Sequence, residues 1–101
     1  MPRAVVRSEA SIQKAVVAYA KQRGCIAIKQ STAGRFGTAG WPDYLIISLE
    51  GRVMFMEFKR QGGEPTPLQD RRMSELRGNM IDCYVVDEVS LGKALVDGLC
   101  L

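Results

Sequence analysis

The chain has 101 residues, a charged content of 25% and a net charge of +3, and it contains no histidine. Without histidine there can be no Ser-His-Asp triad, no histidine general base and no histidine metal ligand. A hydrolase built from this chain would therefore need carboxylates, lysine and a hard cation such as magnesium or manganese. The length predicts one domain over residues 1–101, and no apolar run approaches the ~20 residues of a membrane span.

The charge distribution bears on the class of binding partner, and the cysteines bear on the redox state of the compartment. Residues 1–77 hold 13 Lys and Arg against 7 Asp and Glu, which favours a polyanionic partner, although a solvated basic surface would give the same count. The three cysteines lie far apart and form no Cys-x-x-Cys pair. They predict free thiols in a reducing cytoplasm rather than a zinc site or a disulfide frame.

The first predicted element is a helix that begins after Ser8 and runs to about Arg23. Apolar residues at helical spacing, with Ile12 and Val16 among them, form one face. Glu9 extends that inward face, although an acid in the first helical turn is also explained by the helix dipole.

Residues 25–30 predict a short strand, and residues 31–40 predict a loop. In this loop Gly34, Gly37 and Gly40 recur at every third position, with Arg35 among them. The spacing does not match a dinucleotide-binding fingerprint. The loop could bring backbone N–H groups to a phosphate, and a plain connector is an equally good interpretation.

Two apolar runs, residues 41–47 and 53–59, predict a hairpin that carries charged residues near one end: Asp43, Glu57 and Lys59. Each alone has an ordinary explanation as a turn residue or a solvated strand end. Their coincidence at one end of one sheet favours a functional site. Both faces of the hairpin are apolar, so we expect it to be central and covered on both sides.

The register of this hairpin decides whether a site can form. A two-residue turn would set Asp43 opposite Phe58 and send the carboxylates of Asp43 and Glu57 to opposite faces. A three-residue loop that ends with Gly51 in the left-handed conformation sets Asp43 directly across from Glu57, with Cα atoms ~4.5–5.5 Å apart. We predict the three-residue loop.

A second helix is predicted from Thr66 to about Arg77, with Pro67 at its first position, Gln69 completing a capping box and Gly78 at its end. Gln69 is explained by this cap, although its place on the helix also turns it inward. Residues 80–86 then predict a strand parallel to the previous one, and residues 89–98 a closing helix. The expected class is α/β, in the order αβββαβ followed by the last helix.

The charged residues of the hairpin support a phosphodiesterase chemistry. Asp43 and Glu57 could share one divalent cation through oxygen, and such a cation polarises a phosphoryl oxygen and lowers the pKa of bound water. Lys59 lies two residues past Glu57, ~7 Å further along the same face. It could position the attacking water or stabilise charge that develops on the phosphate.

These residues resemble a known nuclease family. Pro42-Asp43 followed by Glu57-Phe58-Lys59 resembles the PD-(D/E)XK superfamily. Together with Glu9, Gly40-Trp41-Pro42-Asp43 and Thr66-Pro67-Leu68-Gln69, the chain looks like the virus-type replication-repair nuclease (VRR-NUC) branch, in its stand-alone phage-like form. The resemblance runs from Glu9 to about Val86. It implies a restriction-endonuclease-like αβββαβ core with a mixed central sheet flanked by helices.

The resemblance also implies roles and partners. Cleavage of DNA would depend on Mg²⁺ or Mn²⁺, Lys59 would be the catalytic lysine, and Gln69 the motif glutamine near the site. The implied metal ligands are Asp43, Glu57, Glu9 and the main-chain carbonyl of Phe58. Small stand-alone members resemble Holliday-junction resolvases and act as homodimers, which would place the protein in DNA repair and, if phage-encoded, in the host cytoplasm.

The leading hypothesis is a structure-selective DNA endonuclease. The alternatives are a non-catalytic nucleic-acid-binding module and a hydrolase of small phosphate esters. Contacts to DNA phosphates are expected from five basic residues: Lys29, Arg35, Arg60, Arg71 and Arg72. A dimer interface could come from apolar segments at Val5 and Val6, in the Phe36–Trp41 loop and in Leu95–Leu101.

Overall fold

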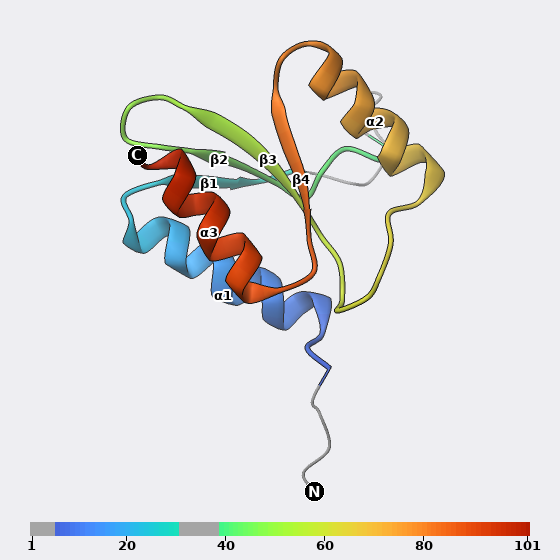
Figure 1. The fold of residues 1–101 in the computed structure, drawn as a ribbon, viewed down its shortest axis with the longest axis horizontal. Coiled ribbons are helices and arrows are strands. Elements are labelled where there is room, and N and C mark those ends of the chain that lie inside the picture. The colour runs from blue at the N-terminus through green and yellow to red at the C-terminus, as the bar shows by residue number, and fades with distance from the viewer. Residues whose placement is uncertain (1–5, 31–38) are drawn as a thin grey trace, which may run out of the picture.

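The computed structural model describes residues 6–30 and 39–101, and its elements follow the predicted order. The elements are α1 (Glu9–Gln22), β1 (Ile26–Lys29), β2 (Tyr44–Ile47), β3 (Val53–Phe58), α2 (Pro67–Gly78), β4 (Asp82–Val86) and α3 (Val89–Leu99). Figure 1 shows α1 and α3 lying side by side across the sheet, with α2 set apart from them.

The four strands form one mixed sheet in the order β1-β2-β3-β4. The first three are antiparallel neighbours, and β4 joins β3 in parallel, as the strand–helix–strand connection predicted. The hairpin of β2 and β3 therefore occupies the centre of the sheet. This confirms the predicted α/β class with a mixed sheet between helices.

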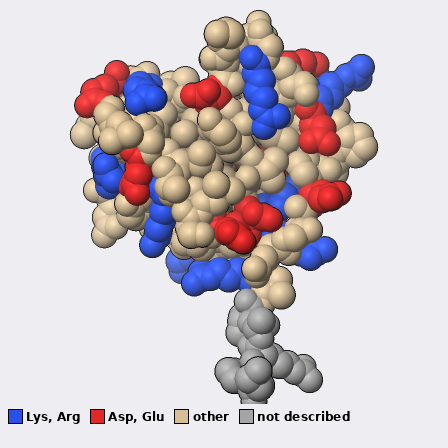
Figure 2. Space-filling model, in the orientation of Figure 1, with Lys and Arg blue, Asp and Glu red and all other residues tan. Residues whose placement is uncertain are grey.

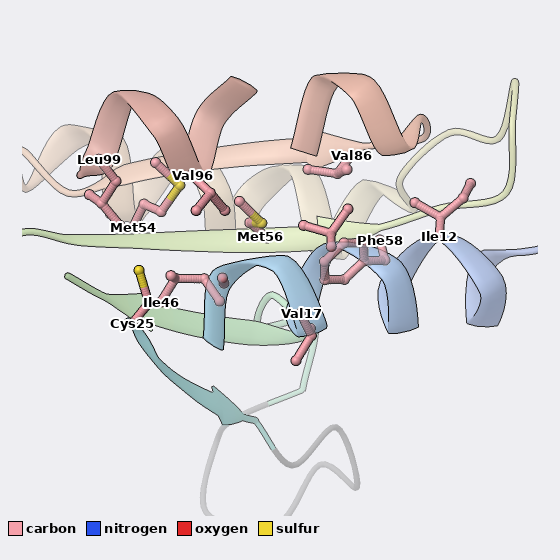
Figure 3. Packing of buried hydrophobic residues seen from close by; sticks show 12 residues of the cluster. Ile12, Val17, Cys25, Ile46, Met54, Met56, Phe58, Val86, Val96 and Leu99 are labelled. Atoms are coloured by element: carbon pink, nitrogen blue, oxygen red, sulfur yellow. The ribbon is translucent and has the colours of Figure 1, made fainter. Parts of the chain in front are cut away.

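The main core lies between the sheet and the helix pair α1 and α3. Alternate residues of β3 point into it, and they meet apolar side chains from both helices (Figure 3). Its fully buried members include Ile12, Val16, Ile46, Met56, Phe58 and Val96. Cys25 and Cys100 border this core as free thiols with their sulfurs 3.5 Å apart.

The opposite face of the sheet is covered only in part, which corrects the expectation of a hairpin buried on both sides. There α2 buries a small cluster of Met73, Leu76 and Cys83 against β4 and Phe55. The hairpin residues on this face are only half-buried: Leu45, Ile47, Val53 and Phe55. On the neighbouring strand β1, Ile26 is 59% exposed and Ile28 43% exposed. Within the described residues α2 is the helix that packs on this face, and its 12 residues reach β4 rather than β1.

The apolar segments predicted as candidates for a dimer interface differ in how deeply the fold buries them. Val6 is exposed, whereas Val96 and Leu99 point into the main core and leave Leu101 exposed at the end of the chain. Val5 and the first half of the Phe36–Trp41 loop lie outside the described residues. Trp41 packs its ring on Phe55 at 5.8 Å between centroids. Most of the described candidates are therefore explained by the core.

Charge on the face seen in Figure 2 is mixed, with basic and acidic side chains interspersed rather than gathered in one patch. No helix among the described residues combines the length and the apolar character that a membrane crossing requires.

The close packing of α3 on α1 predicts a size limit at Gly92. A Cβ at this position would contact Val16 Cγ2 and lie 2.8 Å from Val16 Cγ1 and 3.1 Å from Val86 Cγ1. Gly92→Ala should lower the free energy of unfolding by about 1–3 kcal/mol, because overpacking outweighs the helix propensity of alanine. Gly98→Ala in the same helix meets nothing within 4 Å and is the matched control. It should be neutral or stabilising by up to ~1 kcal/mol in urea denaturation, and equal effects of the two variants would contradict the prediction.

Candidate active site

The hairpin loop has three residues, as predicted. The amide of Ser48 donates to the carbonyl of Arg52 at 2.8 Å, and the amide of Gly51 donates to the carbonyl of Ser48 at 3.0 Å. Gly51 has a φ of +81°, the left-handed conformation that closes such a loop. The register pairs Tyr44 with Met56, so one further step along both strands sets Asp43 across from Glu57.

Pro42 modifies the end of this ladder. In an antiparallel pair every second residue pair exchanges two hydrogen bonds, and the bonded pair of Ser48 and Arg52 puts Pro42 at such a position opposite Phe58. Proline has no N–H to give to the carbonyl of Phe58. The amide of Phe58 donates to Asp43 Oδ2 at 2.8 Å, which fixes that carboxylate at the end of the sheet.

Three carboxylates converge at this end of the sheet. Glu9, Asp43 and Glu57 each offer an oxygen, and these oxygens lie within 4.8 Å of one another. Glu9 comes from the first turn of α1, where Ser8 caps the helix by accepting from the amide of Ser11 at 3.1 Å. Glu9 is exposed, Asp43 is half-buried and Glu57 is buried. The structure thus brings together the acids that the sequence singled out.

Glu57 is the buried member of this cluster, with 1% of its surface exposed. Its Oε2 accepts from Gln69 Nε2 at 3.2 Å and lies 3.7 Å from Lys59 Nζ. Its Oε1 is also buried, and no described residue donates a hydrogen bond to it. A buried carboxylate oxygen without a donor is costly, which suits a group that receives a cation.

Burial and, next to it, the charge of Asp43 raise the pKa of Glu57 to about 8, while Lys59 acts in the opposite direction. A carboxyl group with this pKa is mostly protonated at neutral pH. A cation that binds between Glu57 and Asp43 would favour the ionised form, because opposite charge stabilises a carboxylate.

Gln69 serves the helix and the acid at the same time. Its side-chain Oε1 accepts from the backbone amide of Thr66 at 2.8 Å, and its backbone amide donates to Thr66 Oγ1 at 3.2 Å. These two hydrogen bonds complete the predicted capping box. Its Nε2 reaches Glu57. The two interpretations of this residue are therefore compatible, since the amide group has one end for each partner.

Two contacts that the sequence did not reveal hold the segment before Asp43. Gly40 has a φ of +78°, and a Cβ there would lie 2.6 Å from Leu68 Cγ. Arg72 Nε donates to the carbonyl of Ala39 at 3.2 Å, while its Nη1 pairs with Glu75 at 3.1 Å. The glycine was visible in the motif, but its partner on α2 required the tertiary structure.

The five basic residues expected at phosphates occupy different surroundings. Arg71 and Lys29 are exposed, and Arg35 lies outside the described residues. Arg60 is exposed beside the carboxylates, where it lines a hollow of about 490 Å³ with Ser8, Glu9, Lys59, Gly63 and Glu64. Arg72 is held by Ala39 and Glu75, so its guanidinium is already engaged.

The chain is similar to known proteins in sequence and in fold, although no protein-family model matches it. "Putative nuclease p44" of Acyrthosiphon pisum secondary endosymbiont phage 1 is 34% identical over 87 residues, which cover 86% of this chain and 90% of that protein. A solved VRR_NUC domain is 28% identical and superposes with a TM-score of 0.78 over 88% of this chain and 94% of that domain. The chain belongs to the VRR-NUC family of nucleases.

The donor set of this VRR-NUC site fits a hard divalent cation. The converging groups of Glu9, Asp43 and Glu57 are all oxygens, which Mg²⁺ and Mn²⁺ prefer over nitrogen or sulfur ligands. The buried Oε1 of Glu57 supplies an acceptor that the described protein atoms leave without a donor. The three acids could hold such an ion without a change of fold.

The raised pKa of Glu57 predicts how the stability of the metal-free VRR-NUC protein depends on pH. The folded state keeps this proton up to about pH 8, whereas the unfolded state releases it near the ordinary glutamate pKa of 4.5. The contribution of the Glu57 proton to the free energy of unfolding is therefore fully present below pH ~4.5. It is lost as the pH rises towards 8, with a limiting slope of about 1.4 kcal/mol per pH unit. In urea denaturation with a chelator, Glu57→Gln should equal wild type near pH 4.5 and exceed it at pH 8.

The matched control is Glu50→Gln, an exposed acid of the hairpin loop, which should follow the wild-type pH profile. Addition of Mn²⁺ should stabilise wild type and leave Glu57→Gln unchanged. Parallel pH profiles for wild type and Glu57→Gln would contradict the assignment of a raised pKa to this carboxyl.

The double role of Gln69 predicts a separation between two variants that both weaken the cap of α2. Gln69→Leu and Thr66→Ala should each lower stability by about 1 kcal/mol. Only Gln69→Leu removes the donor to the carboxylate of Glu57, so only it should raise the pKa of that group further. The midpoint pH of Mn²⁺ binding, followed by calorimetry, should move upwards in Gln69→Leu alone. An equal movement in Thr66→Ala would assign the effect to the helix.

Proposed function

We propose that this VRR-NUC protein is a structure-selective DNA endonuclease that requires Mg²⁺ or Mn²⁺. One observation carries the proposal: Glu57 converges with the carboxylates of Asp43 and Glu9, and its buried Oε1 has no donor among the described residues. A merely structural buried acid would be paired on both oxygens. The family of nucleases to which the chain belongs supports hydrolysis of a nucleic-acid phosphodiester.

The proposed ligands of the cation are Asp43, Glu57, Glu9 and the main-chain carbonyl of Phe58. The carbonyl is a suitable ligand because Pro42, opposite it, has no N–H to donate. The cation supplies Lewis-acid polarisation of a phosphoryl oxygen and acidifies a bound water. The amide of Phe58 holds the Asp43 carboxylate in place at 2.8 Å, so the ligand geometry is set before substrate arrives.

Lys59 is proposed as the catalytic lysine. Its Nζ lies 3.7 Å from Glu57 Oε2, and its side chain is 17% exposed at the hollow that Glu9 and Arg60 also line. An ammonium group at this position can orient the attacking water and stabilise negative charge on the phosphate as the leaving oxygen departs. Gln69 keeps the carboxylate of Glu57 turned towards the other acids.

A homodimer that acts on branched DNA follows from the same proposal. Two strands of a junction need two cuts, and the described residues of one chain offer one set of converging acids for them. Two-fold symmetry is the commonest way to present two equal sites. Holliday-junction-resolvase-like cleavage in DNA repair, in the host cytoplasm if the gene is of phage origin as in the relative named above, completes the proposal.

The decisive experiment incubates labelled four-way junction, flap and linear duplex with Mg²⁺ or Mn²⁺. Wild type should cut at least one branched substrate faster than the duplex, and a chelator should stop it. Lys59→Ala and Asp43→Ala should each lose about 10²–10³-fold in rate, because each removes a charge from the reacting centre. Lys93→Ala and Asp82→Ala remove charges on α3 and β4, away from the acids, and should keep wild-type rates.

The alternatives predict other results. Intact DNA in every wild-type lane, with binding that does not depend on a divalent ion, would support a non-catalytic binding module. Hydrolysis of bis(4-nitrophenyl) phosphate without any cleavage of DNA would support a hydrolase of small phosphate esters. Either outcome would contradict the endonuclease proposal.

A further inference from the structure

A second hollow lies along α1 on the side away from α3. It has a volume of about 380 Å³ and is lined by Gln13, Lys14, Val17, Ala18, Lys21 and Tyr44. Ala18 and Val17 present short side chains between the two lysines, so the helix surface is recessed there. None of the residues listed above for phosphate contact lines this hollow.

The hollow is basic. Lys14 and Lys21 are seven residues apart on α1, which places them on one side of the helix, ~10 Å apart along its axis. Lys29 of β1 is the direct cross-strand partner of Tyr44, so its side chain shares the face on which Tyr44 lies. No carboxylate lines the hollow, and no salt bridge of the described residues involves any of these three lysines.

The hollow begins one helical turn along α1 from the acid cluster. Gln13 follows Glu9 by one turn, and side chains at this spacing are neighbours on a helix surface. Tyr44 follows Asp43 at the start of β2, with its side chain on the α1 face of the sheet. A strand with one phosphate at the carboxylates can therefore place its next phosphates along α1, towards Lys14 and then Lys21.

The lining of the hollow includes an aromatic ring that is held in place by packing. The ring of Tyr44 meets the buried ring of Phe58 edge-on, with 6.0 Å between centroids and 82° between planes. Val17 is buried beside it. A fixed aromatic ring beside cationic side chains is the combination by which proteins hold a strand of nucleic acid without reading its sequence.

A row of lysines on a helix is most often a solvated face. Here Lys14 and Lys21 line a concavity, lack acidic partners among the described residues and follow the acids along α1. We propose that the hollow between α1 and β2 binds the backbone phosphates of the nucleic-acid strand that leads away from the scissile phosphate. This inference rests on the proposed nuclease function for the placement of that phosphate, and it newly assigns Lys14 and Lys21 to strand binding.

The test compares two double variants that remove the same charge. Lys14→Gln/Lys21→Gln neutralises the hollow. Lys93→Gln/Arg52→Gln is the matched control, because Lys93 lies over the ring of Tyr19 on the α3 side of α1, and Arg52 lies at the hairpin loop and bonds to the carbonyl of Gly98. Binding of labelled branched and single-stranded oligonucleotides is measured over a range of salt concentrations, with Ca²⁺ as the divalent ion and the probe checked for integrity.

The hollow variant should bind about tenfold more weakly than wild type at ~0.1 M salt, and the slope of log Kd against log salt should fall by ~1.5, since two phosphate contacts are lost. The control variant should stay within about twofold of wild type in affinity. Both should hydrolyse bis(4-nitrophenyl) phosphate at the wild-type rate, because this ester is too short to reach Lys21. Thermal unfolding checks that both variants fold like wild type.

The outcomes keep this inference separate from the proposed function. An equal loss of oligonucleotide affinity in the two double variants would overturn the assignment of the hollow. It would show that the lysines act only through the net charge of the protein. Failure of wild type to cleave any substrate would overturn the nuclease proposal, and the binding comparison would still decide whether the hollow holds a strand.

Discussion

The site depends on one constraint, the register of the β2–β3 hairpin. With the three-residue loop closed by Gly51, Asp43 and Glu57 project from opposing positions on one face. A loop shorter by one residue would send one of them to the other face, because side chains alternate along a strand. The pKa of Glu57 is raised by its burial and by repulsion from the facing carboxylate of Asp43. The fold tolerates the repulsion because Gln69 donates a hydrogen bond to the carboxylate of Glu57 and Lys59 forms an ion pair with it.

Helix α2 connects stability to the site through a small number of atoms. Its capping box starts the helix, and the same glutamine that closes the box donates to Glu57. One turn further, Arg72 holds the carbonyl of Ala39, and Leu68 covers Gly40, so the segment that leads to Asp43 rests on this helix. A change in the start of α2 would therefore move both strand-borne acids, which makes the helix a structural support of the candidate active site.

The two faces of the sheet have unequal tasks. The face under α1 and α3 carries the main core, and close contact at Gly92 lets the two helices pack tightly. The other face is buried only near β4, where α2 contacts it. The acids sit at the end of the strands, where side chains from both layers can reach them: Glu9 from α1 and Gln69 from α2. A central hairpin is the element that both layers share.

The sequence by itself determined the element order, the parallel attachment of β4, the three-residue loop and the identity of the acids, because these follow from local patterns: caps, apolar periodicity, a glycine suited to a positive φ and a motif with fixed spacing. The tertiary structure decided the rest. It left Ile26 and Ile28 exposed, since coverage of a face depends on where a distant helix packs. It joined Arg72 to Ala39 and buried Glu57 with one oxygen lacking a donor. Such contacts link residues far apart in the chain, and no local pattern encodes their distance or their solvation.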